Sequence, residues 1–346
     1  MPVIALSYLQ KIVEGRDLTI IEAEAQMGEI FKSATDAQIG ALLVALRMKG
    51  ESVSEIAGFA RKMRDSAVLI HPMVKGVLVD TCGTGGDAAN TINVSTAAAI
   101  VSAACGVVVA KHGNYAVSSK CGSANVLSEL GVNISTTPEA VVAMIERLGI
   151  GFMLAPIFHP AMKRVAPIRR ELGLRTVFNI LGPLTNPAGA QAQVMGVYDP
   201  RLCQKLASVF LMMGTERALV VHGSGMDEIT NTGETQISEL LDGAVRSYCI
   251  MPQDLGYPLA KPEDLLGGTP VDNARRLVAV MKGERSPARD IIAMNGGAAV
   301  YVSGGASTLK EGAKMAEEAI DSGRAMEVLH KMVEMNGDYG KLVRFL

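Results

Sequence analysis

The sequence contains no tryptophan, and aromatic residues make up only 4% of its 346 residues. Hydrophobic residues nevertheless reach 49%, against 20% charged residues, which excludes a disordered chain. The core must therefore be built from alanine, glycine, valine, leucine, isoleucine and methionine. Such small side chains favour helices packed closely on a sheet. The length is greater than one compact domain usually needs, so we expect two.

An excess of basic residues is also missing. The 33 lysines and arginines are balanced by 35 acidic residues, giving a net charge of −2. Proteins that bind nucleic acids usually carry a basic excess or a basic tail. We therefore expect no nucleic-acid partner, although a local basic site could still hold a small phosphate.

Disulfide, zinc and membrane signals are absent as well. The five cysteines are an odd number and form no Cys-x-x-Cys pair, so neither a disulfide framework nor a zinc site is expected. The first residues lack the basic and apolar regions of a secretion signal. The apolar stretch 97–110 is too short to span a bilayer. We expect a cytoplasmic protein without membrane contact.

Residues 1–72 show apolar residues only at helical spacing. Thr19 and Ser54 are candidate start residues for two of four expected helices, and no strand pattern separates these helices. The segment therefore predicts a small helical domain. A charged helical segment at 161–172 predicts a return of the chain to this domain, near 160–176.

Short apolar runs then alternate with helical patterns, which predicts an α/β domain with a central, mostly parallel sheet flanked by helices. This domain would comprise residues 73–159 and 177–346. The expected strands are 77–80, 107–110, 152–154, 194–197 and 218–221. The expected helices are 96–104, 124–130, 138–148, 200–213, 274–281 and 309–322.

A glycine-rich loop, Asp80-Thr81-Cys82-Gly83-Thr84-Gly85-Gly86-Asp87, follows the first expected strand and leads into a helix. Backbone N–H groups of such a loop, together with a helix N-terminus, can surround phosphate oxygens. Neither a P-loop nor a dinucleotide fingerprint fits its spacing. On glycines alone a simple turn is about as common as an anion site. The hydroxyls of Ser95 and Thr96 could cap the helix or face an anion or a metal.

Two further polar clusters follow expected strands. Lys111-His112-Gly113-Asn114 comes directly after 107–110, and Asp227-Glu228 follows the strand at 218–221. Polar groups of open α/β sheets gather at the carboxyl ends of strands, so these clusters and the glycine-rich loop can share one site. Adjacent carboxylates suit Mg²⁺, which prefers oxygen ligands shared with phosphates. Taken alone, a histidine such as His112 more often belongs to a solvated loop than to a functional site. Two adjacent acidic residues are likewise often ordinary surface residues.

An arginine could clamp a carboxylate with two parallel hydrogen bonds. The sequence offers four candidates before the segment 177–187 and does not distinguish among them: Arg164, Arg169, Arg170 and Arg175. Most of them are expected to be ordinary surface charges.

Taken together, these motifs resemble the anthranilate phosphoribosyltransferase family over essentially the whole chain. The resemblance rests on Gly83-Thr84-Gly85-Gly86-Asp87, Asn93-Val94-Ser95-Thr96, Lys111-His112-Gly113-Asn114, Cys121-Gly122-Ser123-Ala124, Val177–Pro187 and Asp227-Glu228, in the order of the family. It implies a nucleoside phosphorylase-like fold. It also implies a magnesium-dependent phosphoribosyl transfer from phosphoribosyl pyrophosphate (PRPP) to anthranilate, the second step of tryptophan biosynthesis.

The resemblance also implies a role for individual residues. Lys111, Asp227 and Glu228 would serve catalysis, and Ser95, Asp227 and Glu228 would hold two Mg²⁺ ions. Anthranilate would contact Gly83, Asn114 and Arg169, with His112 and Pro183 lining its channel. PRPP would be held by Gly83, Gly86, Asp87, Thr91, Asn93, Val94, Ser95, Thr96, Lys111, His112, Gly113, Asn114, Tyr115, Ala116, Val117, Ser118, Ser119 and Ser123. The family forms homodimers through its helical domain.

Two positions depart from the family pattern. Tyr115 stands where arginine is common, and Asn125 where aspartate is common. Loss of that arginine could weaken phosphate contacts, for which Lys120 could compensate. The rival enzyme is a pyrimidine nucleoside phosphorylase, which needs no acidic metal pair. A non-catalytic, nucleic-acid-binding relative of the same fold is the rival from another class.

Overall fold

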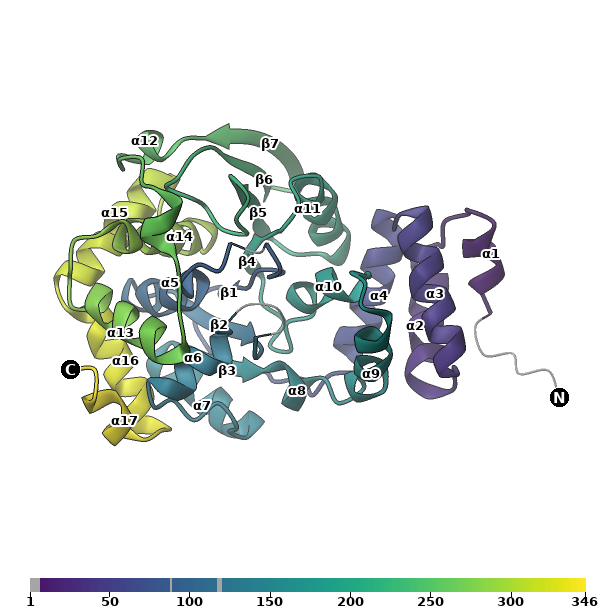
Figure 1. The fold of residues 1–346 in the computed structure, drawn as a ribbon, viewed down its shortest axis with the longest axis horizontal. Helices are drawn as coiled ribbons and strands as arrows, with labels where there is room; N and C mark the ends of the chain where they lie inside the picture. The colour runs from purple at the N-terminus through teal and green to yellow at the C-terminus, as the bar shows by residue number, and fades with distance from the viewer. Residues whose placement is uncertain (1–6, 88, 117–119) are drawn as a thin grey trace.

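The computed structural model describes residues 7–87, 89–116 and 120–346. Its first elements are helices, which form one end of the molecule in Figure 1. They are α1 (Leu9–Val13), α2 (Ile20–Lys32), α3 (Asp36–Lys49) and α4 (Val53–Asp65). Thr19 accepts a hydrogen bond from the Glu22 amide and caps α2, as predicted. Helix α4 is capped by Ser52, so the prediction that Ser54 opens it is wrong by two residues.

A seven-stranded sheet lies beyond the helical end, with the strand order β3-β2-β1-β4-β5-β6-β7. The first five strands in this order are parallel, and β6 and β7 continue the sheet as an antiparallel hairpin. The hairpin was not predicted, because its residues form no continuous apolar run of the kind that marks the buried parallel strands. The strands are β1 (Leu78–Thr81), β2 (Val108–Gly113), β3 (Ile150–Leu154), β4 (Ala192–Gly196), β5 (Arg217–Gly223), β6 (Thr235–Leu241) and β7 (Ala244–Ile250).

Helices cover the sheet, and the C-terminal ones gather at the end opposite to α1–α4 (Figure 1). The longer ones are α5 (Val94–Ala104), α7 (Pro138–Leu148), α11 (Leu202–Met213), α13 (Pro270–Met281), α14 (Pro287–Val302), α15 (Leu309–Asp321) and α16 (Arg324–Met335). The shorter ones are α6 (Ser123–Glu129), α8 (Ala155–Phe158), α10 (Phe178–Leu181), α12 (Pro252–Leu255) and α17 (Tyr339–Val343), with 3₁₀ turns at Gly182–Leu184 and Pro262–Leu265. The fold class predicted from the sequence is confirmed.

Helix α9 (Met162–Leu172) packs against α2 and α3. Alternate residues of β5 reach different parts of the core. Leu219 and Val221 face the cluster under α5 and α14, whereas Ala218 and Val220 join the cluster that contains the helical end. One face of the sheet is therefore continuous with the core of α1–α4, which fixes the helical end against the sheet. Among the described residues, no helix has the length and apolarity to span a membrane.

Candidate functional site

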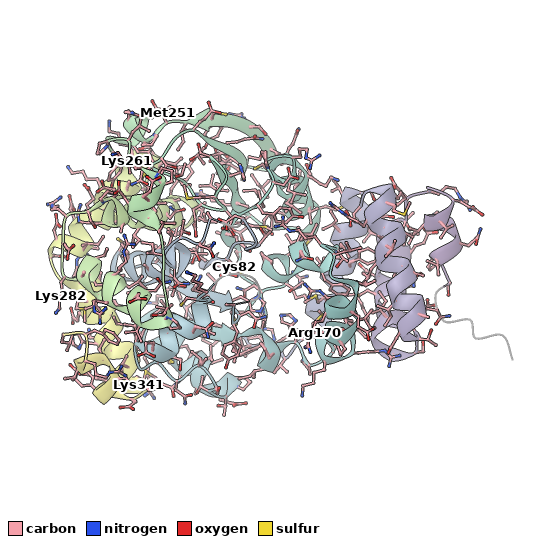
Figure 2. All side chains as sticks on the ribbon, viewed as in Figure 1. Cys82, Arg170, Met251, Lys261, Lys282 and Lys341 are labelled. Atoms are coloured by element: carbon pink, nitrogen blue, oxygen red, sulfur yellow. The ribbon has the colours of Figure 1, made fainter. Side chains whose placement is uncertain are left out.

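The parallel strands β1, β2, β4 and β5 end at one edge of the sheet, and the polar motifs follow these ends. We call the resulting group the strand-end cluster. Asp80 and Thr81 belong to β1, so the glycine-rich loop proper comprises residues 82–87. The cluster contains this loop, the start of α5, Lys111 of β2 and the pair Asp227-Glu228. Cys82, the first residue of the loop, lies in the middle of the molecule in Figure 2, far from the labelled lysines at its rim.

Asp227 contacts the glycine-rich loop directly. Its Oδ2 accepts a hydrogen bond from the Gly85 amide at 2.7 Å, and its own amide donates to Asp87 Oδ2 at 3.3 Å. The loop can approach this closely because it lacks side chains: a Cβ on Gly83 would lie 2.6 Å from Asp227 Oδ2. Gly85 and Gly86 have φ values of +63° and +79°, which favour glycine.

Glu228 and Lys111 meet at the start of α5. The Ser95 amide donates to Glu228 Oε1 at 3.2 Å, and the Lys111 ammonium lies 3.4 Å from the Ser95 hydroxyl. Lys111 also donates to the Thr81 carbonyl oxygen at the end of β1. A lysine that is only 3% exposed is therefore held between the end of β1 and the start of α5.

The buried carboxylates of the cluster repel one another, and burial disfavours their charged forms. Burial, followed by the charge of Asp87, raises the pKa of Asp227 to about 7. Burial and then the charge of Asp227 raise the pKa of Glu228 well above its usual value. Oxygen ligands that repel each other in this way fit a hard divalent cation such as Mg²⁺.

A second group with metal-binding side chains is Asp80, Cys82 and His112, whose ligand atoms lie within 4.8 Å of one another. Both Asp80 oxygens are already used, since they accept from the His112 amide at 3.1 Å and from Asn186 Nδ2 at 2.7 Å. Burial also raises the pKa of the Cys82 thiol. This group therefore fits Mg²⁺ less well than the carboxylate cluster does.

The predicted PRPP residues before α5 lie beside the loop that follows β2. Asn93 donates from Nδ2 to the Cys121 carbonyl at 3.0 Å, so it joins the two segments. Thr91 pairs with Leu266 in an isolated bridge. Val94 and Thr96 are buried, and no residue in the described part of the chain forms a hydrogen bond with the Thr96 hydroxyl. The capping role considered for the hydroxyls of Ser95 and Thr96 is wrong, because α5 begins after Asn93 without a side-chain cap.

The segment after β2 is closed by Asn125. Its Oδ1 accepts from the amides of Ala116 and Gly122, each at 3.0 Å, and an aspartate could accept both bonds equally well. The Asn114 amide donates to Ser123 Oγ at 3.2 Å, and Tyr115 is 44% exposed. Val117, Ser118 and Ser119 lie outside the described residues.

Arg169 belongs to α9, and His112 follows Lys111 in β2. The Arg169 guanidinium is 5.6 Å from the centre of the Phe178 ring, and burial lowers its pKa. The His112 ring lies 5.0 Å from the ring of His159, and burial, followed by the charge of His159, lowers the pKa of His112 to about 3. His112 is therefore neutral at pH 7. Gly182, which precedes Pro183 in a 3₁₀ turn, lies beside this ring.

The roles of three residues of this region were not predicted from the sequence. His159 follows β3 and α8, and its buried ring nitrogens have no hydrogen-bond partner among the described residues. Asn186 Nδ2 donates to Asp80 and also to the Ala110 carbonyl at 2.8 Å. Arg175, considered above for a carboxylate, donates to the Gly86 carbonyl, and its guanidinium lies 4.1 Å from the centre of the Tyr198 ring. Of these three residues, only His159 had a sequence signal that could have pointed to the site, namely its position after an expected strand.

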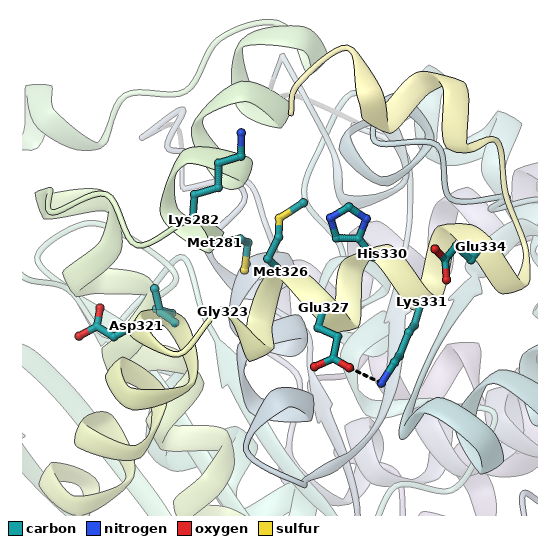
Figure 3. A pocket seen from close by; sticks show the side chains of 10 residues that line it. Met281, Lys282, Asp321, Gly323, Met326, Glu327, His330, Lys331 and Glu334 are labelled. Carbon is teal, nitrogen blue, oxygen red and sulfur yellow. Dashed lines mark ion pairs between the residues drawn. The ribbon is translucent and has the colours of Figure 1, made fainter.

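A cavity of about 560 Å³ lies elsewhere, on the C-terminal helices (Figure 3). Its wall includes Met326, His330 and an ion pair of 2.7 Å between Glu327 and Lys331. None of the predicted site residues that the structure describes lines it. The strand-end cluster therefore remains the candidate active site.

Comparison with known proteins gives consistent matches along the chain. Residues 6–67 match the helical bundle domain of a glycosyl transferase family, and residues 75–326 match its a/b domain. Anthranilate phosphoribosyltransferase of Methanosarcina acetivorans is 57% identical over 92% of this chain and 86% of its own length. The enzyme of Methanococcoides burtonii is 54% identical over 94% of this chain and 93% of its own.

Solved structures agree with these matches. The crystal structure of the Thermus thermophilus anthranilate phosphoribosyltransferase has a TM-score of 0.90 and 43% identity, covering 94% of this chain and 98% of that one. The Saccharomyces cerevisiae enzyme in complex with PRPP and Mg has a TM-score of 0.88 and 29% identity, covering 97% of this chain and 98% of that one.

Proposed function

We propose a function for the strand-end cluster from one premise: the chain belongs to the anthranilate phosphoribosyltransferase family. The protein transfers the 5-phosphoribosyl group of PRPP to anthranilate, giving N-(5-phosphoribosyl)anthranilate and pyrophosphate, in tryptophan biosynthesis. The observation that carries the site assignment is the contact of Asp227 with Gly85, which unites the acidic pair and the glycine-rich loop.

PRPP is held, in this proposal, by the loops that follow β1 and β2. The amides of Gly83 and Gly86 face its phosphates, because those of Gly85 and Ser95 already donate to Asp227 and Glu228. Lys111 supplies a buried positive charge beside them. The predicted residues Gly83, Gly86, Asp87, Thr91, Asn93, Val94, Ser95 and Thr96 belong to the first segment. Lys111 to Ser119 and Ser123 belong to the second, and the buried Val94 and Thr96 contribute through their backbone.

The enzyme uses Mg²⁺. We assign the ion to Asp227, Glu228 and the Ser95 hydroxyl, and propose that the site takes two ions, since Asp87 adds a third carboxylate next to Asp227. When bound, Mg²⁺ neutralises the negative charge that develops on the pyrophosphate leaving group.

Anthranilate is placed on the side of the cluster that faces α9 and α10. Arg169 binds its carboxylate and Asn114 and Gly83 contact it, while the neutral His112 ring and Pro183 line the approach. The bond from C1 of the ribose to the pyrophosphate oxygen breaks, and a new bond forms from C1 to the aryl nitrogen, which then loses a proton. The arylamine is neutral at pH 7, so positioning supplies much of the rate enhancement.

A nucleoside phosphorylase is the alternative with a related site, and a direct assay separates the two. Wild-type protein should release pyrophosphate and consume anthranilate fluorescence only when PRPP, anthranilate and Mg²⁺ are all present. Phosphate-dependent cleavage of a pyrimidine nucleoside, with no anthranilate consumption, would overturn the proposal. A salt-dependent shift with DNA or RNA and no turnover would instead favour the non-catalytic alternative.

We further propose that residues 1–72, with the return near 160–176, form a helical domain that joins two copies of the chain, and that 73–159 and 177–346 form the catalytic domain. Ile21 and Met48 support this, because they are 78% and 82% exposed on α2 and α3. Sedimentation equilibrium should give a dimer that Met48→Lys weakens. A wild-type monomer at micromolar concentration would contradict the proposal.

We place the enzyme in the cytoplasm. All five cysteines are free thiols, as a reducing compartment would leave them. Fractionation of cells should recover the activity with cytoplasmic marker enzymes.

A further inference from the structure

Asn273 on α13 connects the C-terminal helices to the proposed PRPP segment. Its side chain is 1% exposed. Its Oδ1 accepts from the Gly268 amide at 2.7 Å, and its Nδ2 donates to Asn93 Oδ1 at 2.8 Å. Because Asn93 Oδ1 is occupied in this way, its Nδ2 points to the Cys121 carbonyl, at 3.0 Å. Asn273 thus fixes which end of the Asn93 amide faces the loop after β2.

Asn295 on the next helix, α14, makes a similar connection to the acidic pair. It is 2% exposed. Its Oδ1 accepts from the Ile229 amide at 3.0 Å, and its Nδ2 donates to the Ile229 carbonyl at 2.8 Å. A third bond, of 2.8 Å, ties Nδ2 to the Ile291 carbonyl within α14. Both backbone groups of the residue after Glu228 are therefore fixed by one side chain.

Neither asparagine belongs to the motifs that carry the family resemblance, and both lie on helices that contribute no side chain to the strand-end cluster as defined above. A buried amide is costly unless its donors and acceptors are paired, so each side chain has one favoured orientation. A shift of about 1 Å in a catalytic group can cost about a hundredfold in rate. A buried side chain with fully paired hydrogen bonds holds the neighbouring site residue in place and so prevents such a shift.

We propose that Asn273 and Asn295 are separate positioning residues, the first for PRPP through Asn93 and the second for the metal-binding carboxylates through Ile229. This inference rests on the proposed function. It assigns a different consequence to each residue: loss of Asn273 weakens PRPP binding, whereas loss of Asn295 weakens metal binding. A purely structural role would instead lower stability without separating the two ligands.

The test of Asn273 uses Asn273→Asp in the full-length protein. The new carboxylate still accepts from the Gly268 amide but cannot donate to Asn93. The KM for PRPP should rise about tenfold, the change expected from one hydrogen bond of roughly 1.4 kcal/mol, with kcat altered less. Calorimetric titration with PRPP in excess Mg²⁺ should show the same loss. In the double variant with Asn93→Ala, the loss should not exceed that of Asn93→Ala alone.

The test of Asn295 uses Asn295→Leu, with Asn231→Leu as the matched control. Asn231 is also buried, but its Nδ2 donates to the Pro287 carbonyl at the start of α14 and not to the residue that follows Glu228. Both variants should lose thermal stability. Only Asn295→Leu should need about tenfold more Mn²⁺ for half-saturation, measured as free Mn²⁺ by electron paramagnetic resonance without turnover.

The possible outcomes are distinguishable. Separate losses, PRPP for Asn273 and metal for Asn295, support the proposal. Equal effects of Asn295→Leu and Asn231→Leu on Mn²⁺ binding, or additive effects of Asn273→Asp and Asn93→Ala, would overturn it while wild-type activity stands. Wild-type protein without anthranilate-dependent pyrophosphate release would refute the proposed function itself.

Discussion

Asp227 Oδ2 and the Gly85 amide nitrogen are 2.7 Å apart, although 142 residues separate them in the sequence. This hydrogen bond brings a proposed metal ligand against a proposed phosphate loop. This geometry requires glycine at two positions that pack against Asp227. A Cβ on Gly83 would lie 2.6 Å from Asp227 Oδ2, and a Cβ on Gly196 of β4 would lie 1.5 Å from the Asp227 carbonyl oxygen. Substrate and metal functions therefore share one close backbone packing.

Gly83→Ala should damage activity through Asp227. The added methyl group would lie 2.6 Å from Asp227 Oδ2 and must displace the carboxylate. We expect kcat/KM for PRPP to fall by about a hundredfold, as for a displacement of about 1 Å. Gly40→Ala in α3 is the control, since nothing lies within 4 Å of its new methyl group. It should retain full activity and gain about 0.5–1 kcal/mol in stability. Equal activity of both variants would contradict this account.

The double variant Asp227→Asn, Glu228→Gln should have a much lower turnover rate, while its folding is little affected. We expect kcat to fall by at least about 10²-fold, because stabilisation of leaving-group charge is lost. Mutual repulsion of the acids disappears in this variant, so its melting temperature in EDTA should equal or exceed that of wild type. Steady-state kinetics and calorimetry check both statements. Unchanged turnover would refute the metal assignment.

The acidic pair should also make stability depend on pH. The pKa of Asp227 is about 7 in the folded protein, against 3.8 for an unperturbed aspartate. Between these values the folded state binds more protons than the unfolded state, so the contribution of Asp227 to stability is lost as pH rises through about 7. Metal-free wild type should therefore lose stability relative to Asp227→Asn between pH 5 and pH 8.

The quantity to measure is the difference in melting temperature between wild type and Asp227→Asn. The buried histidines change the stability of both proteins with pH in the opposite direction, so their effect cancels in this difference. The pKa values of His112 and His159 are lowered to about 3 and about 4, so these groups favour the folded state as pH rises through 6.5. Calorimetry in EDTA at constant ionic strength checks the prediction. A constant difference in melting temperature across this range would contradict it.

Arg175→Ala should weaken PRPP binding without unfolding the protein. The side chain is exposed, but it donates to the Gly86 carbonyl and stacks on Tyr198. We expect the KM for PRPP to rise about five- to tenfold, consistent with roughly 1 kcal/mol for one hydrogen bond, at a nearly unchanged melting temperature. Arg170→Ala, also exposed, is the control and should behave as wild type. Equal KM values for the two variants would remove the role of Arg175.

Local residue patterns predicted the parallel part of the sheet well. The run at 218–221 lies inside β5, and the helix expected at 138–148 has the bounds of α7. Continuous apolar runs and N-cap residues are local signals, so they can be read without the fold. The β6–β7 hairpin and the buried helix α14 were missed, since their residue patterns are weaker and their burial depends on distant neighbours.

The site shows the same division between local and long-range information. The order of the residues is enough to tell which chemical groups are present and that they follow strand ends, because it fixes which end of each expected strand is the carboxyl end. Folding in three dimensions was needed to establish that Asp227 reaches Gly85, that Arg175 reaches Gly86, and that two asparagines support the site from the C-terminal helices. These contacts depend on side-chain directions and packing across long sequence separations, for which a single sequence carries no local signal.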